Sequence, residues 1–200
     1  MRAGSPAPAP RLFFVRHGET DWNAEGRLQG QHDIPINARG REQAAHAGQR
    51  LRDLRPDVAR LPWVVSPLHR TRETAEIARA AIGLSRDGYR LEDRLKEISF
   101  GRLEGSTWKE VRRADPDLAR QREADKWRFV APEGESYESL AERVSVWANA
   151  VTTDTVVVSH GGVARALMRI LCDVAVEKAS MADIWQGRVL VFEAGRYSWV

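Results

Sequence analysis

Residues 12–19, LFFVRHGE, determine how the rest of the chain is interpreted. Four apolar residues stop abruptly at Arg16-His17-Gly18. A short apolar run that ends in charged residues and glycine is typical of a buried strand running into a loop. Residues 155–162, TVVVSHGG, repeat this plan with the strongest β-branched run of the chain, which ends at Ser159 and His160. Two predicted strands are therefore each followed at once by a histidine.

Helical patterns separate the predicted strands. Small and apolar residues recur every three or four positions over residues 41–54, which indicates one face of a helix. Ser66 is expected to cap a further helix that has Pro67 at its first position. The same helix is expected to continue over residues 71–82. Further helices are expected over residues 106–129 (one or two), 136–150 and 163–172, and further strands over 61–65, 90–92, 188–192 and 197–200, the last two as a hairpin. Strands alternating with helices predict an α/β fold, a three-layer α/β/α sandwich with a largely parallel central sheet.

The length of 200 residues suits one domain, expected over residues 11–200, with a helical insertion at about 105–130. The Pro/Ala-rich residues 1–10 are interpreted as a disordered lead-in rather than a secretory signal, so a cytoplasmic protein is expected. No apolar run is long enough to span a bilayer, so no membrane partner is expected. The only cysteine, Cys172, excludes an internal disulfide and is expected to act as a small hydrophobic residue.

The charge distribution and the spacing of potential metal ligands argue against two functions, nucleic-acid binding and metal binding. The formal charge is only +3, and 27 of the 31 basic residues are arginines scattered among acids. Binding of a nucleic-acid backbone needs a contiguous basic surface, so no nucleic-acid partner is expected. The five histidines and the one cysteine show no zinc-type spacing, and neither a metal nor a cofactor is expected.

The two histidines at strand ends lie where α/β proteins bind ligands, at the carboxyl edge of the sheet. Gly18 and Gly161, which follow them, allow the backbone to approach a bound group closely. Arg16 and Arg70 also follow predicted strands, and a guanidinium matches phosphoryl oxygens in a bidentate manner. This set predicts a site for a phosphorylated small molecule.

Two histidines and two arginines in one pocket are suited to phosphoryl transfer. A neutral imidazole attacks phosphorus, and arginines together with a second imidazolium stabilise the phosphoryl oxygens without a metal. The proton donor for the leaving oxygen is assigned to Glu97, whose neighbours are mostly apolar, because burial raises the pKa of a carboxyl group. The alternative is that Glu97 pairs with Arg94 or Arg102 at the surface.

These residues resemble the signature of a known family. Arg16-His17-Gly18-Glu19-Thr20-x-x-Asn23 is similar to the motif of the histidine phosphatase superfamily, the phosphoglycerate-mutase-like proteins. Three later blocks agree with that family in order and approximate spacing: Ser66-Pro67-Leu68-His69-Arg70 with Thr74-Ala75, then Glu97 with Phe100-Gly101 and Glu104-Gly105, then Ser159-His160-Gly161-Gly162. The resemblance covers residues 12–171.

The resemblance implies a phosphoglycerate-mutase-like fold and a role for each site residue. Arg16, His17, Arg70 and His160 would form the phosphate pocket with help from Asn23, and His17 would be phosphorylated. Glu97 would protonate the leaving group and then activate water. The segments Arg27-Leu28-Gln29-Gly30 and Pro132-Glu133-Gly134-Glu135-Ser136 would border the substrate.

The family contains both phosphatases and mutases. Cofactor-dependent mutases of this family carry a longer insertion with a Trp-Arg-Arg-Ser-like cluster, whereas this chain has only Trp127-Arg128-Phe129. The difference favours a phosphatase, with a mutase as the alternative. Sugar phosphates, α-ribazole phosphate and phosphoproteins remain open as substrates, and so does a homodimer.

Overall fold

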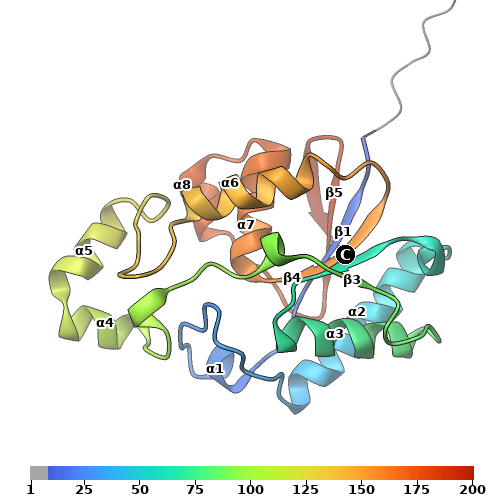
Figure 1. Cartoon of the computed structure of the whole chain (residues 1–200), viewed down its shortest axis with the longest axis horizontal. Helices are drawn as coiled ribbons and strands as arrows, with labels where there is room; N and C mark the ends of the chain where they lie inside the picture. Colours follow the sequence, from blue (N-terminus) through green and yellow to red (C-terminus); the bar gives the residue numbers. More distant parts are fainter. Residues whose placement is uncertain (1–8) are drawn as a thin grey trace, which may run out of the picture.

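The computed structural model describes residues 9–200, in which a central sheet lies between two layers of helices (Figure 1). The six strands are β1 (Leu12–Arg16), β2 (Trp63–Val65), β3 (Arg90–Leu91), β4 (Thr155–Ser159), β5 (Val189–Glu193) and β6 (Arg196–Trp199). The helices are α1 (Asp21–Ala24), α2 (Ala38–Leu54), α3 (His69–Ala81), α4 (Trp108–Ala114), α5 (Pro116–Ala124), α6 (Tyr137–Ala148), α7 (Gly161–Cys172) and α8 (Val176–Met181). Short 3-10 turns cover Val58–Arg60, Asp93–Leu95 and Gly101–Leu103.

The sheet has the order β3-β2-β4-β1-β5-β6. Strands β3, β2, β4 and β1 are parallel to one another, and β5 and β6 complete the sheet as an antiparallel hairpin. The predicted fold class, an α/β sandwich with a largely parallel sheet, is confirmed, and so is the closing hairpin.

Alternation along the strands builds one apolar core on each face of the sheet. Phe13 and Val15 of β1 face α2 and α3, where they join Leu51 in the core. Leu12 and Phe14 face the opposite layer and pack with residues of α6 and α7, among them Trp147 and Leu167. Helices covering both faces explain why the central strands are apolar at every position rather than at alternate ones.

Several predicted boundaries need correction. Helix α3 begins at His69 after Leu68, which gives no side-chain cap, so the prediction that Ser66 caps this helix is wrong. The hydroxyl of Ser66 lies instead against the ring of His160. Helix α2 begins three residues earlier than expected, because Asn37 accepts a hydrogen bond from the amide of Gly40 and caps it. The strand expected over residues 61–65 is limited to β2, and α1 and α8 are not predicted.

Other predictions concern the region 106–129, Cys172 and the N-terminal residues. The region 106–129 contains two helices, α4 and α5, which lie to one side of the sheet (Figure 1). Cys172 ends α7 and packs on the apolar core, and burial raises the pKa of its thiol. Of the predicted lead-in over residues 1–10, residues 1–8 lie outside the described part of the chain. Within residues 9–200, no helix has the length and apolar character needed to cross a membrane.

The contact between α2 and α3 gives a stability prediction. A Cβ atom added to Gly48 would overlap the backbone carbonyl of Ala78 on α3. Gly48→Ala should therefore lower the free energy of unfolding by about 1–3 kcal/mol, the usual effect of overpacking. Alanine is otherwise the better helix former by about 1 kcal/mol, so the sign of the change tests the contact.

Urea unfolding measures this effect, and Gln49→Ala at the exposed neighbouring position is the control. A Gly48→Ala protein as stable as the parent would show that the two helices do not pack this closely.

Candidate active site

Parallel pairing of β1 and β4 brings the two histidines together. Arg16 is level with Ser159 in the register, and the amide of His17 continues the ladder by donating to the carbonyl of Ser159 at 2.9 Å. The ring centroids of His17 and His160 are 5.2 Å apart, and both rings are buried. Arg70 comes from the first turn of α3, behind β2, the other neighbour of β4. The strand-end residues singled out by the sequence thus meet at one edge of the sheet.

His17 is held in one tautomer. Its Nδ1 lies 2.7 Å from the carbonyl oxygen of Gly18. Because a carbonyl oxygen only accepts hydrogen bonds, Nδ1 carries the proton and Nε2 carries the lone pair. Burial first, and then the charges of Arg70 and Arg16, lower the pKa of His17 well below 6.5. At neutral pH this imidazole is an uncharged potential nucleophile.

Both arginines are held by backbone carbonyls. Arg70 donates to the carbonyls of His32 at 2.6 Å and Gly30 at 2.7 Å, and Arg16 donates to the carbonyl of Ile184 at 2.8 Å. Within the described residues, the Nε atoms of Arg16 and Arg70 are buried and have no hydrogen-bond partner. Two buried donors are therefore free to contact an oxyanion.

The cations at this edge of the sheet lack a full complement of negative charge. Burial lowers the pKa of Arg16 to about 10, and the nearby guanidinium of Arg165 contributes to this shift. Burial also lowers the pKa of Arg70 to about 10. Glu97 offsets part of this effect for both arginines, and Asp33 and Glu104 do so for Arg70. Burial still dominates, so a bound anion would stabilise both guanidiniums further. The site is electrostatically suited to phosphate.

His160 is expected from the sequence to act as a second imidazolium, and this stays a prediction for the phosphate-bound protein. Burial, followed by the charges of Arg70, His17 and Arg16, lowers its pKa well below 6.5. Its Nε2 lies 2.8 Å from the hydroxyl of Ser66, while Nδ1 is buried and has no partner among residues 9–200. The contact with Ser66 fixes the orientation of the ring, and Nδ1 remains for a ligand.

Glu97 lies at the N-terminus of α7. Its carboxylate accepts from the amide of Gly162 at 3.0 and 3.2 Å and from its neighbour Ile98 at 2.9 Å. The alternative pairing at the surface is wrong, because Arg94 pairs with Glu92 and Arg102 pairs with Glu133. Glu97 is half-buried rather than fully buried, so its carboxyl group combines access to solvent with a fixed position.

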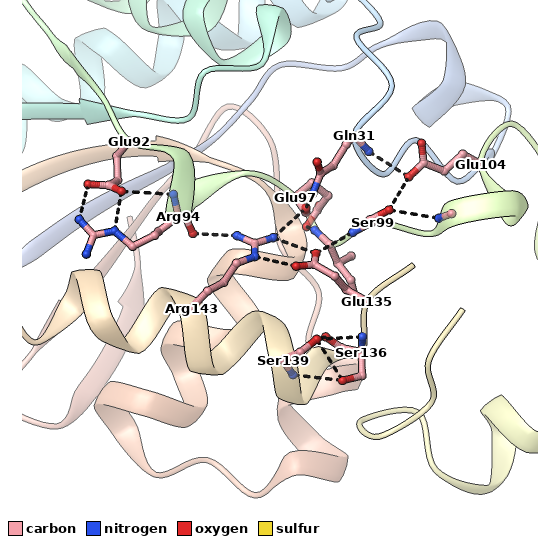
Figure 2. A network of polar contacts seen from close by, with 12 residues as sticks. Gln31, Glu92, Arg94, Glu97, Ser99, Glu104, Glu135, Ser136, Ser139 and Arg143 are labelled. Atoms are coloured by element: carbon pink, nitrogen blue, oxygen red, sulfur yellow. Dashed lines mark hydrogen bonds and ion pairs between the residues drawn. The ribbon is translucent and has the colours of Figure 1, made fainter. Parts of the chain in front are cut away.

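A polar network that the sequence does not reveal holds the backbone of Glu97 (Figure 2). Arg143 on α6 donates to the carbonyl of Glu97 at 3.0 Å and to that of Arg94 at 2.8 Å. The same guanidinium forms a bidentate pair with Glu135, and Gln31 donates to the carbonyl of Glu97 at 3.1 Å. The chain has 27 arginines, and Arg143 lies in an ordinary amphipathic helical pattern. No local signal in the sequence distinguishes it from the others.

The remaining predicted site residues have different surroundings. The side chain of Gln29 is buried, and its Oε1 has no partner among the described residues. Gly30, at φ +51°, supplies its carbonyl to Arg70, and a Cβ atom there would overlap the carboxylate of Glu104. Gly30 therefore reaches the predicted phosphate pocket through its hydrogen bond from Arg70, and the contact of Gln29 with substrate stays a prediction.

Asn23 and Gly161 complete the predicted set. The Oδ1 of Asn23 accepts from the amide of Thr20 and from Gln186, so Asn23 closes the capping box of α1. Its contact with phosphate stays a prediction. Gly161 is buried at the start of α7, where a Cβ atom would lie 3.3 Å from Nη1 of Arg165 and 3.8 Å from Nε of Arg16.

Two histidines and two arginines at the carboxyl edge of an α/β sheet form a site that suits the phosphoryl group of a phosphate ester. The family model of the histidine phosphatase superfamily (branch 1) matches residues 12–200, and the chain belongs to that superfamily. Among residues 9–200, no group of three or more His, Cys, Asp or Glu side chains is arranged to hold a metal ion.

Relatives carry two kinds of name. The probable phosphoglycerate mutase GpmB of Salmonella arizonae is 37% identical over 134 residues, which are 67% of this chain and 59% of that protein. The chain therefore matches less than two thirds of the length of that relative. The solved structure of TTHB049 from Thermus thermophilus is 36% identical, with a TM-score of 0.70 over 90% of this chain and 92% of that one. An Escherichia coli K-12 protein proposed to be an alpha-ribazole-5'-P phosphatase is 25% identical, with a TM-score of 0.79 over 96% and 95% of the two chains.

The depressed histidine pKa values can be measured directly. In an NMR titration of the ring nitrogens, His17 and His160 should remain neutral until the pH is well below 6.5. Inorganic phosphate should shift both titrations upward, because its negative charge offsets that of the arginines.

The variants His17→Gln and His160→Gln assign the signals. A ring of either residue that titrates at or above pH 6.5 in phosphate-free protein would contradict the assignment. The lowered pKa values also make the free energy of unfolding depend on pH. It should decrease as the pH falls below 6.5, because both histidines then bind protons in the unfolded chain but not in the folded one.

Proposed function

We propose that the chain is a phosphatase that hydrolyses a small phosphate monoester through a phosphohistidine on Nε2 of His17. The observation that carries this proposal is the set of buried, unpartnered polar atoms beside that residue among residues 9–200: Nε of Arg16, Nε of Arg70 and Nδ1 of His160. Natural proteins rarely leave such atoms unsatisfied, and a phosphoryl group bound against His17 would satisfy them.

In the first step, the lone pair of Nε2 forms a bond to phosphorus while the bond from phosphorus to the ester oxygen breaks. The carboxyl proton of Glu97 passes to the leaving oxygen. Arg16 and Arg70 stabilise the negative charge on the three remaining phosphoryl oxygens, and His160 contacts them through Nδ1. Because the two guanidiniums supply the positive charge, the proposed reaction needs no metal ion.

In the second step, water attacks the phosphorus atom of phosphohistidine. The carboxylate of Glu97 takes a proton from that water, and the bond between phosphorus and Nε2 breaks. The products are inorganic phosphate and the neutral imidazole, with the proton back on Glu97. One group therefore serves as acid and then as base, which its fixed place at the start of α7 favours.

The alternative is a mutase, which the name of the Salmonella relative favours. The segment Trp127-Arg128-Phe129 supports the phosphatase instead. Trp127 is buried and stacked on Tyr137, and Arg128 is exposed and paired with Asp125 and Glu138. Arg128 therefore lacks the placement of a group that would hold a second anionic end of a phosphoglycerate.

The first test is hydrolysis of p-nitrophenyl phosphate in EDTA. Wild type should release phosphate, and His17→Ala should lose roughly a thousandfold or more of this activity, because the proposed reaction has no second nucleophile. Acid quenching should trap an acid-labile phosphoryl group on wild type and none on His17→Ala.

Two outcomes would contradict the proposal. One is full activity of His17→Ala, and the other is activity that disappears in EDTA. A mutase would instead convert 3-phosphoglycerate to its isomer faster than it releases phosphate, and only with a bisphosphoglycerate primer.

Two esters with different leaving groups distinguish a role of Glu97 and Arg143 in protonation from a role in folding. An alkoxide leaves poorly without a proton, whereas p-nitrophenolate leaves readily. Glu97→Gln should therefore lower kcat about 10²- to 10⁴-fold for an alkyl phosphate and much less for p-nitrophenyl phosphate. Arg143→Gln should show the same bias at roughly tenfold, because it displaces the acid without removing it.

Arg94→Ala is the matched control, since its side chain pairs with Glu92 while its carbonyl stays available to Arg143. Equal losses on both esters in Arg143→Gln would mean that Arg143 stabilises the fold and does not position Glu97.

A further inference from the structure

One buried carboxylate lies between the loop that holds Arg70 and the segment that carries Glu97. Glu104 follows the 3-10 turn Gly101–Leu103, and its side chain is only 8% exposed. Within the described part of the chain it pairs with no arginine or lysine, and its one ionisable partner is the exposed ring of His32. Burying a carboxylate is unfavourable, so the contacts that it makes indicate its role.

On one side, Glu104 contacts every residue of the segment Gly30-Gln31-His32. Its Oε1 accepts from the amide of Gln31 at 3.1 Å (Figure 2), and its Oε2 lies 2.7 Å from Nδ1 of His32. Gly30 packs so closely on this carboxylate that a Cβ atom would overlap Oε1. The carbonyls of Gly30 and His32 hold the guanidinium of Arg70, so Glu104 fixes the segment that positions this arginine.

On the other side, Glu104 contacts the residues that follow Glu97. Its Oε1 accepts from the amide of Phe100 at 2.9 Å and lies 3.4 Å from the hydroxyl of Ser99 (Figure 2). Phe100 is only three residues after Glu97, whose carbonyl also accepts from Gln31. The position of the proposed acid therefore depends on the same carboxylate.

A single oxygen thus bridges the two segments. Oε1 of Glu104 accepts from one amide of each segment, that of Gln31 and that of Phe100. Such a bridge fixes a separation, because a side chain shorter by one methylene does not reach both amides from the same backbone position.

Farther from the site, the backbone joins the same two stretches of chain without the help of Glu104. The amide of Leu28 donates to the carbonyl of Ser106 at 2.9 Å, and the amide of Gly105 donates to the carbonyl of Leu28 at 2.8 Å. The stretches should therefore remain paired when the carboxylate is altered, and the change should be confined to the ends that reach Arg70 and Glu97.

The negative charge of Glu104 offers a second explanation for its presence. Burial lowers the pKa of Arg70, and three nearby acids offset part of this shift, of which Glu104 contributes least. A role in position and a role in charge predict different effects for substitutions that separate reach from charge.

We propose that Glu104 is a positioning residue that sets the separation between Arg70 and Glu97. This inference rests on the proposed phosphatase function, in which Arg70 stabilises the phosphoryl oxygens and Glu97 protonates the leaving oxygen. Displacing either group by about 1 Å is enough to slow a reaction by up to roughly a hundredfold, so loss of the bridge should impair both functions together. Glu104 itself takes no part in making or breaking bonds.

Two substitutions separate reach from charge. Glu104→Asp keeps the charge but is one methylene shorter, whereas Glu104→Gln keeps the length and an acceptor oxygen for both amides but has no charge. Glu104→Asp should raise the inhibition constant of inorganic phosphate roughly tenfold, through Arg70. It should also lower kcat roughly tenfold more for an alkyl phosphate than for p-nitrophenyl phosphate, through Glu97. Glu104→Gln should stay within about threefold of wild type in both measurements.

Glu110 provides the matched control. Its carboxylate also accepts from a backbone amide, that of Thr107, but it closes the capping box of α4 and is exposed. Glu110→Ala should change neither the phosphate inhibition nor the ratio of the two esters.

Three results would overturn the inference. The opposite ranking, with Glu104→Gln impaired and Glu104→Asp like wild type, would assign Glu104 an electrostatic role. Equal losses on both esters with unchanged phosphate inhibition would mean that it only stabilises the fold. Wild-type behaviour of both variants would mean that the bridge is not needed.

Binding of inorganic phosphate to the inactive His17→Ala protein separates this inference from the proposed function. In calorimetry, adding Glu104→Asp should raise the Kd of phosphate roughly tenfold, and adding Glu104→Gln should not. A wild type that hydrolyses no ester would refute the phosphatase, whereas this ranking would still decide whether Glu104 positions Arg70. Phosphate that binds to none of these proteins would refute both.

Discussion

The hydrogen bonds from buried arginines to backbone carbonyls are the interaction on which the rest of the site depends. Arg70 is completely buried, yet the carbonyls of Gly30 and His32 hold it where a carboxylate would usually be found. Carbonyl dipoles fix the guanidinium in place without cancelling its charge. The residual charge, together with burial, keeps His17 and His160 neutral and leaves the pocket in need of an anion.

This arrangement also links the loops to the chemistry. The loop around Gly30 reaches Arg70 through its carbonyl, and Gln31 in the same loop donates to the carbonyl of Glu97. The proposed proton donor is thus tied to the arginine site on one side and to Arg143 of α6 on the other. A substitution that shifts this loop would affect both phosphate binding and protonation, although it changes neither catalytic side chain.

The sequence predicts the layers of the fold and the central residues of the site because both follow local rules. Apolar runs become strands, and the ends of parallel strands meet, so Arg16, His17, Arg70 and His160 can be placed together without coordinates. The short helices α1 and α8 depend on tertiary contacts more than on an apolar pattern, and they are not predicted. Ser66 is a residue type that often caps helices, but its hydroxyl contacts the buried ring of His160 instead. The amide of His69 at the start of α3 donates to the carboxylate of Asp33, a residue 36 positions earlier that no local pattern identifies as the cap.

The electrostatic character of the site is the part that the sequence does not supply. The pKa of His160 depends on burial and on every neighbouring cation, so the imidazolium expected there stays a prediction for the phosphate-bound protein. Likewise, the roles of Arg143 and Arg128 cannot be distinguished in the sequence, although one guanidinium holds the backbone of Glu97 and the other pairs with acids at the surface. Which cation remains without a counter-charge is a property of the whole fold rather than of a motif.

The position of His17 at the end of β1 has a mechanical consequence. Strand β1 is paired on both sides, by β4 and β5, and the amide of His17 continues that ladder. The proposed nucleophile is therefore attached to the stiffest part of the molecule, and thermal opening reaches such central strands last. The attacking nitrogen serves as a fixed reference point, and any adjustment to substrates of different size falls on the loops that surround it.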